Sequence, residues 1–151
     1  MGRAANLGDV STTVSSTAPT ALVRTGRRWP WSVLRVVTVL TTLSAFTQAV
    51  LAGGVVAGRI EALPLHSTNG LLLVVGTLAL LVALVLAWRP GGGPAWTPLA
   101  GLLLTAATVV QLGLGFSRSL AVHVPLGTTV IIAQVMLLVW VWHRPLPAQR
   151  S

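Results

Sequence analysis

The chain has 151 residues, of which 54% are hydrophobic and only 8% charged, and this composition excludes an ordinary soluble globular domain. Cysteine is absent, which excludes disulfides, thiolate metal sites and covalent attachment of a c-type haem. Only two residues are acidic, too few for a carboxylate-rich metal site or a two-carboxylate hydrolase. The formal net charge of +8 comes from arginines that mostly flank apolar stretches, so nucleic acid is not an expected partner.

The polar N-terminal segment, residues 1–28, is rich in Ser, Thr, Ala and Gly and has no apolar stripe. We predict a disordered basic cytoplasmic tail, whose arginines next to the first apolar run attract anionic lipid. A cleaved signal peptide, with its site near residues 49–52, is the alternative. The long polar lead and the apolar run beyond that site favour the tail. Residues 143–151 are predicted to form a second cytoplasmic tail.

Four apolar stretches are long enough to cross a bilayer, and they predict an all-α membrane protein. Pro64 and Pro98 suit the first turn of a helix, and the Pro/Gly run at 89–94 cannot continue one. The very short connection near 117–119 makes the last two helices an antiparallel hairpin. We therefore predict an antiparallel four-helix transmembrane bundle over residues 33–142. The expected helices are about 33–57, 65–88, 96–116 and 120–142.

Arginine and tryptophan positions predict the orientation in the membrane. Most arginines fall on one side, which positive-inside statistics assign to the cytoplasm. These are Arg3, Arg24, Arg27, Arg28, Arg89, Arg144 and Arg150, with Arg35 just inside the first helix, while Arg59 and Arg118 fall on the other side. All six tryptophans lie at the arginine-rich boundary, as in an aromatic belt. The prediction is a multi-pass inner-membrane protein with both termini in the cytoplasm.

The second half of the predicted bundle repeats the first. The order Gln, Arg, His, Gly occurs as Gln48, Arg59, His66, Gly70 and again as Gln111, Arg118, His123, Gly127. We interpret this as an internal two-helix duplication. His66 and His123 then begin two helices that run in the same direction, so they share one depth near the outer surface. Such helices lie diagonally across a bundle, where facing side chains form cofactor sites.

Two facing imidazoles suit the axial ligands of a low-spin b-type haem, so His66 and His123 are the candidate metal ligands. Gly70 and Gly127 lie one turn deeper on the same faces and would leave flat space for a porphyrin. Close helix packing without a ligand is the alternative for such glycines. His143 has no counterpart in the first half, and we interpret it as interfacial.

The other repeated residues also have two interpretations each. Arg59 and Arg118 lie on the histidine side, where they could pair with haem propionates, or they simply extend into lipid headgroups. Glu61 is a competing partner for Arg59. Gln48 and Gln111 could hydrogen-bond the cofactor or a quinone, and interhelical hydrogen bonds are the alternative.

With this pattern the chain resembles one half of haem A synthase, whose four-helix units carry haem-ligating histidines on the second and fourth helices. It is also similar to small actinobacterial four-helix membrane proteins of unknown function. The resemblance covers the helical region and depends on His66, His123 and the small residues near them. Haem A synthase joins two such units and often has an outer cysteine pair, which this chain lacks. The resemblance implies haem binding by these two histidines, and oxidative chemistry on a haem substrate is not expected.

The leading hypothesis is therefore an inner-membrane protein that binds one haem b near the extracytoplasmic side, for electron transfer or haem handling. Enzymatic activity is not expected. Membrane lipids are the general partners, and a quinone, a redox partner protein or a second copy of the chain are candidates. A cofactor-free scaffold or accessory subunit is the main alternative. A small quinone-linked oxidoreductase subunit or a transporter is the third alternative, and a transporter is disfavoured because the charges lie at the helix ends and none lies at midplane.

Overall fold

The computed structural model describes residues 27–146, which form four helices and no strand. The helices are α1 (Trp29–Val56), α2 (Ala62–Trp88), α3 (Thr97–Phe116) and α4 (Leu120–His143). All four are long and apolar enough to cross a membrane, where a helix satisfies its own backbone hydrogen bonds. The predicted fold class is confirmed, and the chain is a multi-pass membrane protein. The predicted N-terminal tail and most of the C-terminal tail lie outside the described residues.

The helix boundaries agree with prediction except near two starts. Helix α1 begins four residues earlier than expected, at Trp29, because Pro30 occupies its first turn. Helix α2 begins at Ala62, and its Pro64 also lies in the first turn, where the missing N–H is not needed. Helix α3 begins at Thr97, and Pro98 likewise lies in its first turn.

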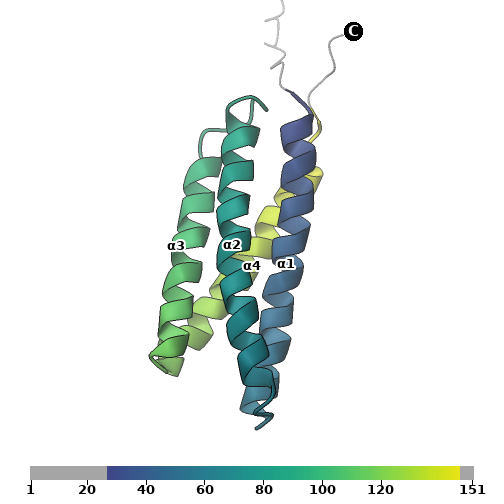
Figure 1. Cartoon of the computed structure of the whole chain (residues 1–151). Coiled ribbons are helices and arrows are strands. Elements are labelled where there is room, and N and C mark those ends of the chain that lie inside the picture. Colours follow the sequence, from purple (N-terminus) through teal and green to yellow (C-terminus); the bar gives the residue numbers. More distant parts are fainter. Residues whose placement is uncertain (1–26, 147–151) are drawn as a thin grey trace, which may run out of the picture.

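The helices form a ring in which each packs against two neighbours (Figure 1). Helix α1 packs against α2 and α4, and α3 packs against the same two helices. Within the described residues the diagonal pairs α1–α3 and α2–α4 have no Cα atoms within 8 Å of each other. The predicted diagonal relation of α2 and α4 is therefore confirmed. Figure 1 shows α4 inclined behind α1 and α2.

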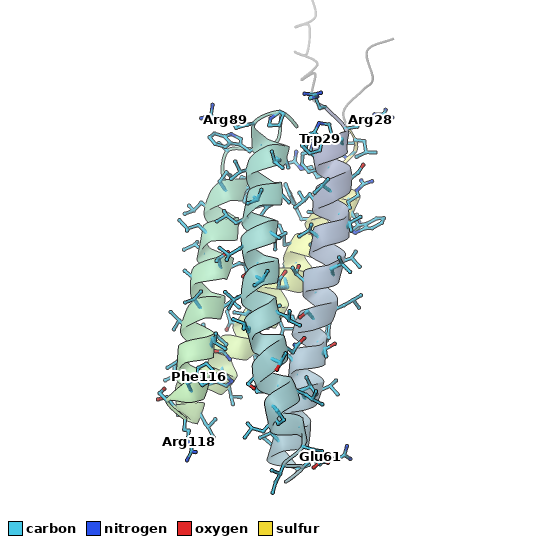
Figure 2. All side chains as sticks on the ribbon, in the orientation of Figure 1. Arg28, Trp29, Glu61, Arg89, Phe116 and Arg118 are labelled. Atoms are coloured by element: carbon cyan, nitrogen blue, oxygen red, sulfur yellow. The ribbon has the colours of Figure 1, made fainter. Side chains whose placement is uncertain are left out.

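The two ends of the bundle differ in chemistry (Figure 2). One end, here called the tryptophan end, contains the start of α1, the α2–α3 loop and the end of α4, with Trp29, Arg28 and Arg89. The opposite end, here called the histidine end, contains the α1–α2 and α3–α4 turns, with Glu61 and Arg118.

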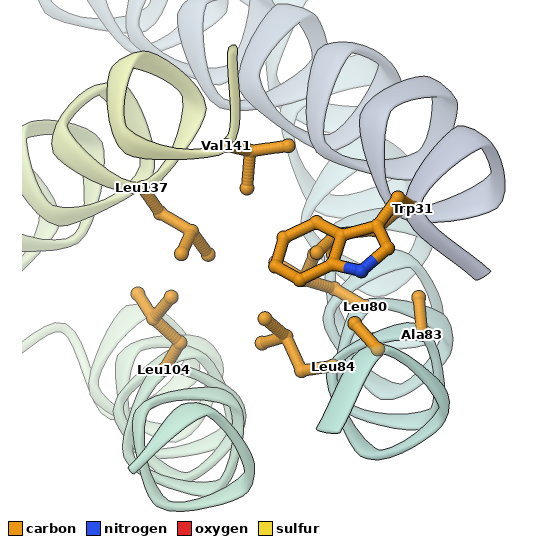
Figure 3. Close-up of a cluster of buried hydrophobic side chains, with 9 residues drawn as sticks. Trp31, Leu80, Ala83, Leu84, Leu104, Leu137 and Val141 are labelled. Atoms are coloured by element: carbon orange, nitrogen blue, oxygen red, sulfur yellow. The ribbon is translucent and has the colours of Figure 1, made fainter. Parts of the chain in front are cut away.

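The interior changes character along the bundle axis. Near the tryptophan end an apolar core packs around Trp31, with Leu34, Leu80, Leu84, Leu104, Leu137 and Val141 (Figure 3). The Trp31 indole donates to the Gly91 carbonyl at 2.9 Å, which ties the α2–α3 loop to α1. Farther along, polar side chains are buried alongside apolar ones such as Ala45, Leu73 and Val130. The buried polar residues of this part are Thr38, Thr41, Thr42, Thr77, Thr105, Thr108 and Gln134.

The two turns at the histidine end have the same hydrogen-bond pattern, a common way for a helix to end. After α1, Arg59 N–H bonds Gly54 O, and after α3, Ser119 N–H bonds Leu114 O, both at 3.0 Å. The left-handed residue of the turn is Gly58 (φ 80°) in the first case and Arg118 (φ 58°) in the second. Arg118 therefore corresponds to Gly58, not to Arg59, and the two arginines are only roughly equivalent.

Candidate functional site

The two histidines of the repeat meet across the bundle. His66 lies in the first turns of α2 and His123 in the first turns of α4, and both are half-buried. Their ring centroids are 6.2 Å apart and the ring planes are inclined at 66°. The expected meeting of two imidazoles from diagonal helices is therefore observed, and we call His66 and His123 the imidazole pair.

The ring of His123 is fixed by a hydrogen bond to the neighbouring helix. Its Nδ1 lies 3.0 Å from the backbone oxygen of Gln111 in α3. A carbonyl oxygen only accepts, so Nδ1 carries the proton and donates. The other nitrogen, Nε2, then carries the lone pair. A backbone carbonyl on Nδ1 is the usual device that prepares Nε2 of a histidine to bind a metal.

Gly115 makes this hydrogen bond possible, and the sequence analysis did not assign it to the site. A Cβ atom at Gly115 would lie 3.1 Å from Cε1 of His123, closer than ordinary contact. The imidazole therefore lies close to the backbone of α3 beside this glycine. Its signal in the sequence was the spacing of four residues from Gln111, which places both on one face of the helix.

A network of amides holds His66. Asn69 Nδ2 donates to the Ser44 carbonyl at 3.0 Å, and this fixes which end of the Asn69 amide is nitrogen. The same Nδ2 donates to Gln48 Oε1 at 2.7 Å. Gln48 Nε2 is left to donate to the backbone oxygen of His66 at 3.0 Å. Ser44 and Asn69 were missed as site residues, although an asparagine inside a membrane helix is itself a functional signal.

One nitrogen of His66 is buried without a partner. Its Nε2 lies 3.4 Å from Gln48 Nε2, a long contact, and its Nδ1 is buried with no hydrogen bond in the structure. If His66 Nδ1 carries a proton, its N–H group has no acceptor. If it carries no proton, its lone pair is free to bind a metal. A buried polar atom left unpaired costs about 1–3 kcal/mol, so a ligand at this nitrogen would be stabilising.

The glutamines bond the histidine backbones in both halves of the repeat. Gln111 Nε2 donates to the backbone oxygen of His123 at 2.7 Å, as Gln48 does to that of His66. These amides take up the space beside the two glycines. A Cβ at Gly127 would lie 2.6 Å from Gln111 Nε2, and one at Gly70 would lie 3.2 Å from Gln48 Nε2. The flat space expected there for a porphyrin is occupied by the glutamine side chains, because the glycines admit the interhelical hydrogen bonds.

Arg59 and Arg118 lie at the histidine end and are exposed. Arg59 and Glu61 form no ion pair with each other, so Glu61 does not compete with an anionic ligand for Arg59. His143 lies at the opposite end of α4, where its Nδ1 bonds Val139 O at 2.8 Å within the same helix. It is exposed and far along the helix from the imidazole pair, as an interfacial residue would be.

The separation of the imidazole pair suits one metal ion between the rings. A metal–imidazole bond is about 2 Å long and the centroid lies about 1 Å behind the nitrogen, so a bridging ion holds the centroids about 6 Å apart. The observed distance is 6.2 Å. Among residues 27–146 no group of three or more His, Asp or Glu side chains could hold a metal ion. Two ligands are too few for a bare structural ion, whereas a haem needs only two ligands from the protein because its macrocycle supplies four nitrogens.

Comparison with protein-family models, with curated proteins and with solved structures finds no match for this chain.

Proposed function

We propose that this protein is a multi-pass inner-membrane protein that binds one haem b between His66 and His123 and serves in electron transfer or haem handling. One observation carries the proposal: two imidazoles from diagonal helices lie with centroids 6.2 Å apart. The hydrogen bond from His123 Nδ1 to Gln111 O adds to it, because it leaves Nε2 as the metal-binding nitrogen.

The residues around the pair have distinct parts in this proposal. His66 and His123 would hold the haem iron, and Gln48, Gln111, Gly70 and Gly127 would act through them by fixing the histidine backbones. Arg59 and Arg118 are at the same end and could pair with the propionates. When bound, the haem would supply a one-electron iron couple.

The orientation belongs to the same proposal. The six tryptophans and five of the seven arginines between residues 27 and 146 lie at the tryptophan end, which positive-inside statistics place in the cytoplasm. The imidazole pair would then lie near the extracytoplasmic surface. A redox partner, a quinone or a second copy of the chain could reach it from that side.

A cofactor-free accessory subunit is the second candidate, and a specific observation favours it. The glutamine amides already fill the space beside Gly70 and Gly127 and satisfy the histidine carbonyls, so the helices pack without a ligand there. In that case His66 and His123 would be packing residues, and their replacement would leave folding and partner co-purification unchanged.

An absorption spectrum tests the proposal. The protein purified in detergent from haem-replete cells should show a Soret band with low-spin α and β bands. We expect His66→Ala and His123→Ala each to remove the low-spin spectrum, because each removes one axial ligand. His143→Ala is the matched control and should keep it. A wild-type preparation without a Soret band would contradict haem binding.

A further inference from the structure

An apolar groove lies between α3 and α4 and extends from the tryptophan end to within one turn of His123. Its volume is about 510 Å³, within the range of pockets that hold small molecules. Its walls include Ala100 and Ala107 from α3 and Ala133 and Met136 from α4. The small alanine side chains leave room between the two helices.

The groove is long and runs along α4. Its lining on α4 extends from Leu126 to Trp140. At 1.5 Å per residue this stretch is about 21 Å long, which exceeds one leaflet of a hydrocarbon core of about 30 Å. One hydrocarbon chain that enters from the tryptophan end can therefore lie in the groove along its full length.

The mouth of the groove at the tryptophan end is aromatic and positively charged. Trp96 and Trp140 line it, and their ring centroids are 4.7 Å apart in an edge-to-face pair. The Arg144 guanidinium lies 4.8 Å from the Trp140 ring centroid. Arg35 donates from Nη2 to the Arg144 carbonyl at 3.0 Å, and its Nε is buried without a partner. The Arg35 guanidinium itself stacks on Trp142, 5.2 Å from that ring centroid, so Arg144 is the cation beside the indole pair.

No carboxylate of the described chain balances these cations. Glu61 is the one acidic residue between 27 and 146, and it lies at the histidine end (Figure 2). We propose that the α3–α4 groove is a binding site for one anionic phospholipid, with an acyl chain along the groove and the phosphate at Arg144 beside Trp140. The proposal does not depend on haem binding.

Charge distinguishes this occupant from its rivals. A second copy docked with the same orientation would bring its own Arg35 and Arg144 to the same level, where like charges repel. A quinol has an apolar tail but no negative charge for Arg144. An anionic phospholipid offers both an acyl chain for the groove and a phosphate for Arg144. An arginine near the membrane surface attracts such a negatively charged headgroup.

The test uses the full-length protein in nanodiscs that contain equal amounts of phosphatidylglycerol and phosphatidylcholine. Native mass spectrometry reports the lipid retained by the protein. We expect the wild type to retain one phosphatidylglycerol in preference to phosphatidylcholine. Arg144→Gln should reduce that preference about fivefold, the effect of one arginine near an anionic headgroup. Arg89→Gln, at the same end of the bundle but outside the groove lining, is its matched control and should leave the retention of this one lipid unchanged.

A second pair of variants tests the groove itself. Ala107→Phe should displace the lipid because Ala107 lines the groove, whereas Ala106→Phe, on the neighbouring exposed position, should not. If Ala107→Phe fails to fold, Arg144→Gln still decides, because Arg144 lies at the helix end. No phosphatidylglycerol preference in the wild type overturns the proposal. The proposal is also overturned if the two alanine variants have equal effects on the bound lipid. Retention of a quinol in place of the phospholipid, or a dimer that Ala107→Phe disrupts, would overturn it too.

Discussion

At the scale of single residues, the orientation of His123 depends on Gly115, which has no side chain. Gly115 lets the imidazole lie close enough to α3 for Nδ1 to reach the Gln111 carbonyl at 3.0 Å. Gly113, two residues earlier, has nothing within 4 Å of its would-be Cβ. Replacing Gly115 therefore disturbs the His123 ring, whereas replacing Gly113 shows only the general effect of a glycine replacement in this helix.

We predict that Gly115→Ala weakens haem binding about tenfold and Gly113→Ala leaves it unchanged, because loss of an outer hydrogen bond to a metal-ligating histidine typically costs 10–100-fold in affinity. Haem titration of the apoprotein, followed at the Soret band, measures both. Equal affinities for the two variants would show that the contact of Gly115 with His123 has no part in binding.

Arg118 holds the left-handed turn position at which the first half of the repeat has Gly58. A residue with a Cβ is disfavoured there by about 1 kcal/mol relative to glycine. Arg118→Gly should therefore raise the free energy of unfolding of the apoprotein by about 1 kcal/mol, and Gly58→Ala should lower it by a similar amount. Unfolding in SDS, followed by circular dichroism, gives both values. If Arg118→Gly destabilises the apoprotein, the arginine side chain contributes a contact that outweighs its backbone strain.

At the scale of helices, a polar layer crosses the middle of the bundle. Most of its threonines bond the carbonyl one turn earlier in their own helix, as Thr42 does to Thr38 O at 2.7 Å. Thr105 also bonds across to Thr77 O of α2 at 3.0 Å. Gln134 is fully buried. Its Oε1 accepts a hydrogen bond from Thr41 Oγ1 at 3.3 Å, whereas its Nε2 has no partner in the structure.

We predict that Gln134→Leu stabilises the bundle by about 1 kcal/mol, since it removes a buried, half-satisfied amide and leaves an apolar side chain of similar size. Gln48→Leu is the contrast, because Gln48 is bonded at both ends of its amide, to Asn69 and to the His66 carbonyl. It should destabilise by a similar amount in the same SDS titration. Destabilisation by Gln134→Leu as large as that by Gln48→Leu would mean that the buried amide has a partner.

The sequence could predict the four spans and the meeting of the histidines, but not the contacts of the site. Span length and Pro/Gly interruptions define the helices, and their alternating direction places His66 and His123 at one depth. The spans are apolar on nearly every face, so periodicity does not show which side faces inward. The role of Gly115 and the bonding of Asn69 depend on helix rotation, which only packing decides.

At the scale of the whole molecule, the two ends differ in composition, and this difference predicts a direction in the membrane. The tryptophans and arginines at one end favour the cytoplasmic interface, and the imidazole pair at the other end would face outward. A reversed orientation would place the proposed haem near the cytoplasm and the arginine-rich end outside, against the positive-inside rule. The direction therefore decides which partners can reach the imidazole pair.

The absence of cysteine makes this direction directly measurable. Ala95, in the α2–α3 loop, and Ser119, in the α3–α4 turn, are both exposed and lie at opposite ends of the bundle. We predict that a membrane-impermeant maleimide labels Ser119→Cys in intact cells and labels Ala95→Cys only after lysis, because the arginines retain the tryptophan end in the cytoplasm. The cysteine-free wild type is the blank, and labelling of both variants in denatured protein controls for thiol reactivity. Labelling of Ala95→Cys alone in intact cells would reverse the orientation and place the imidazole pair on the cytoplasmic side.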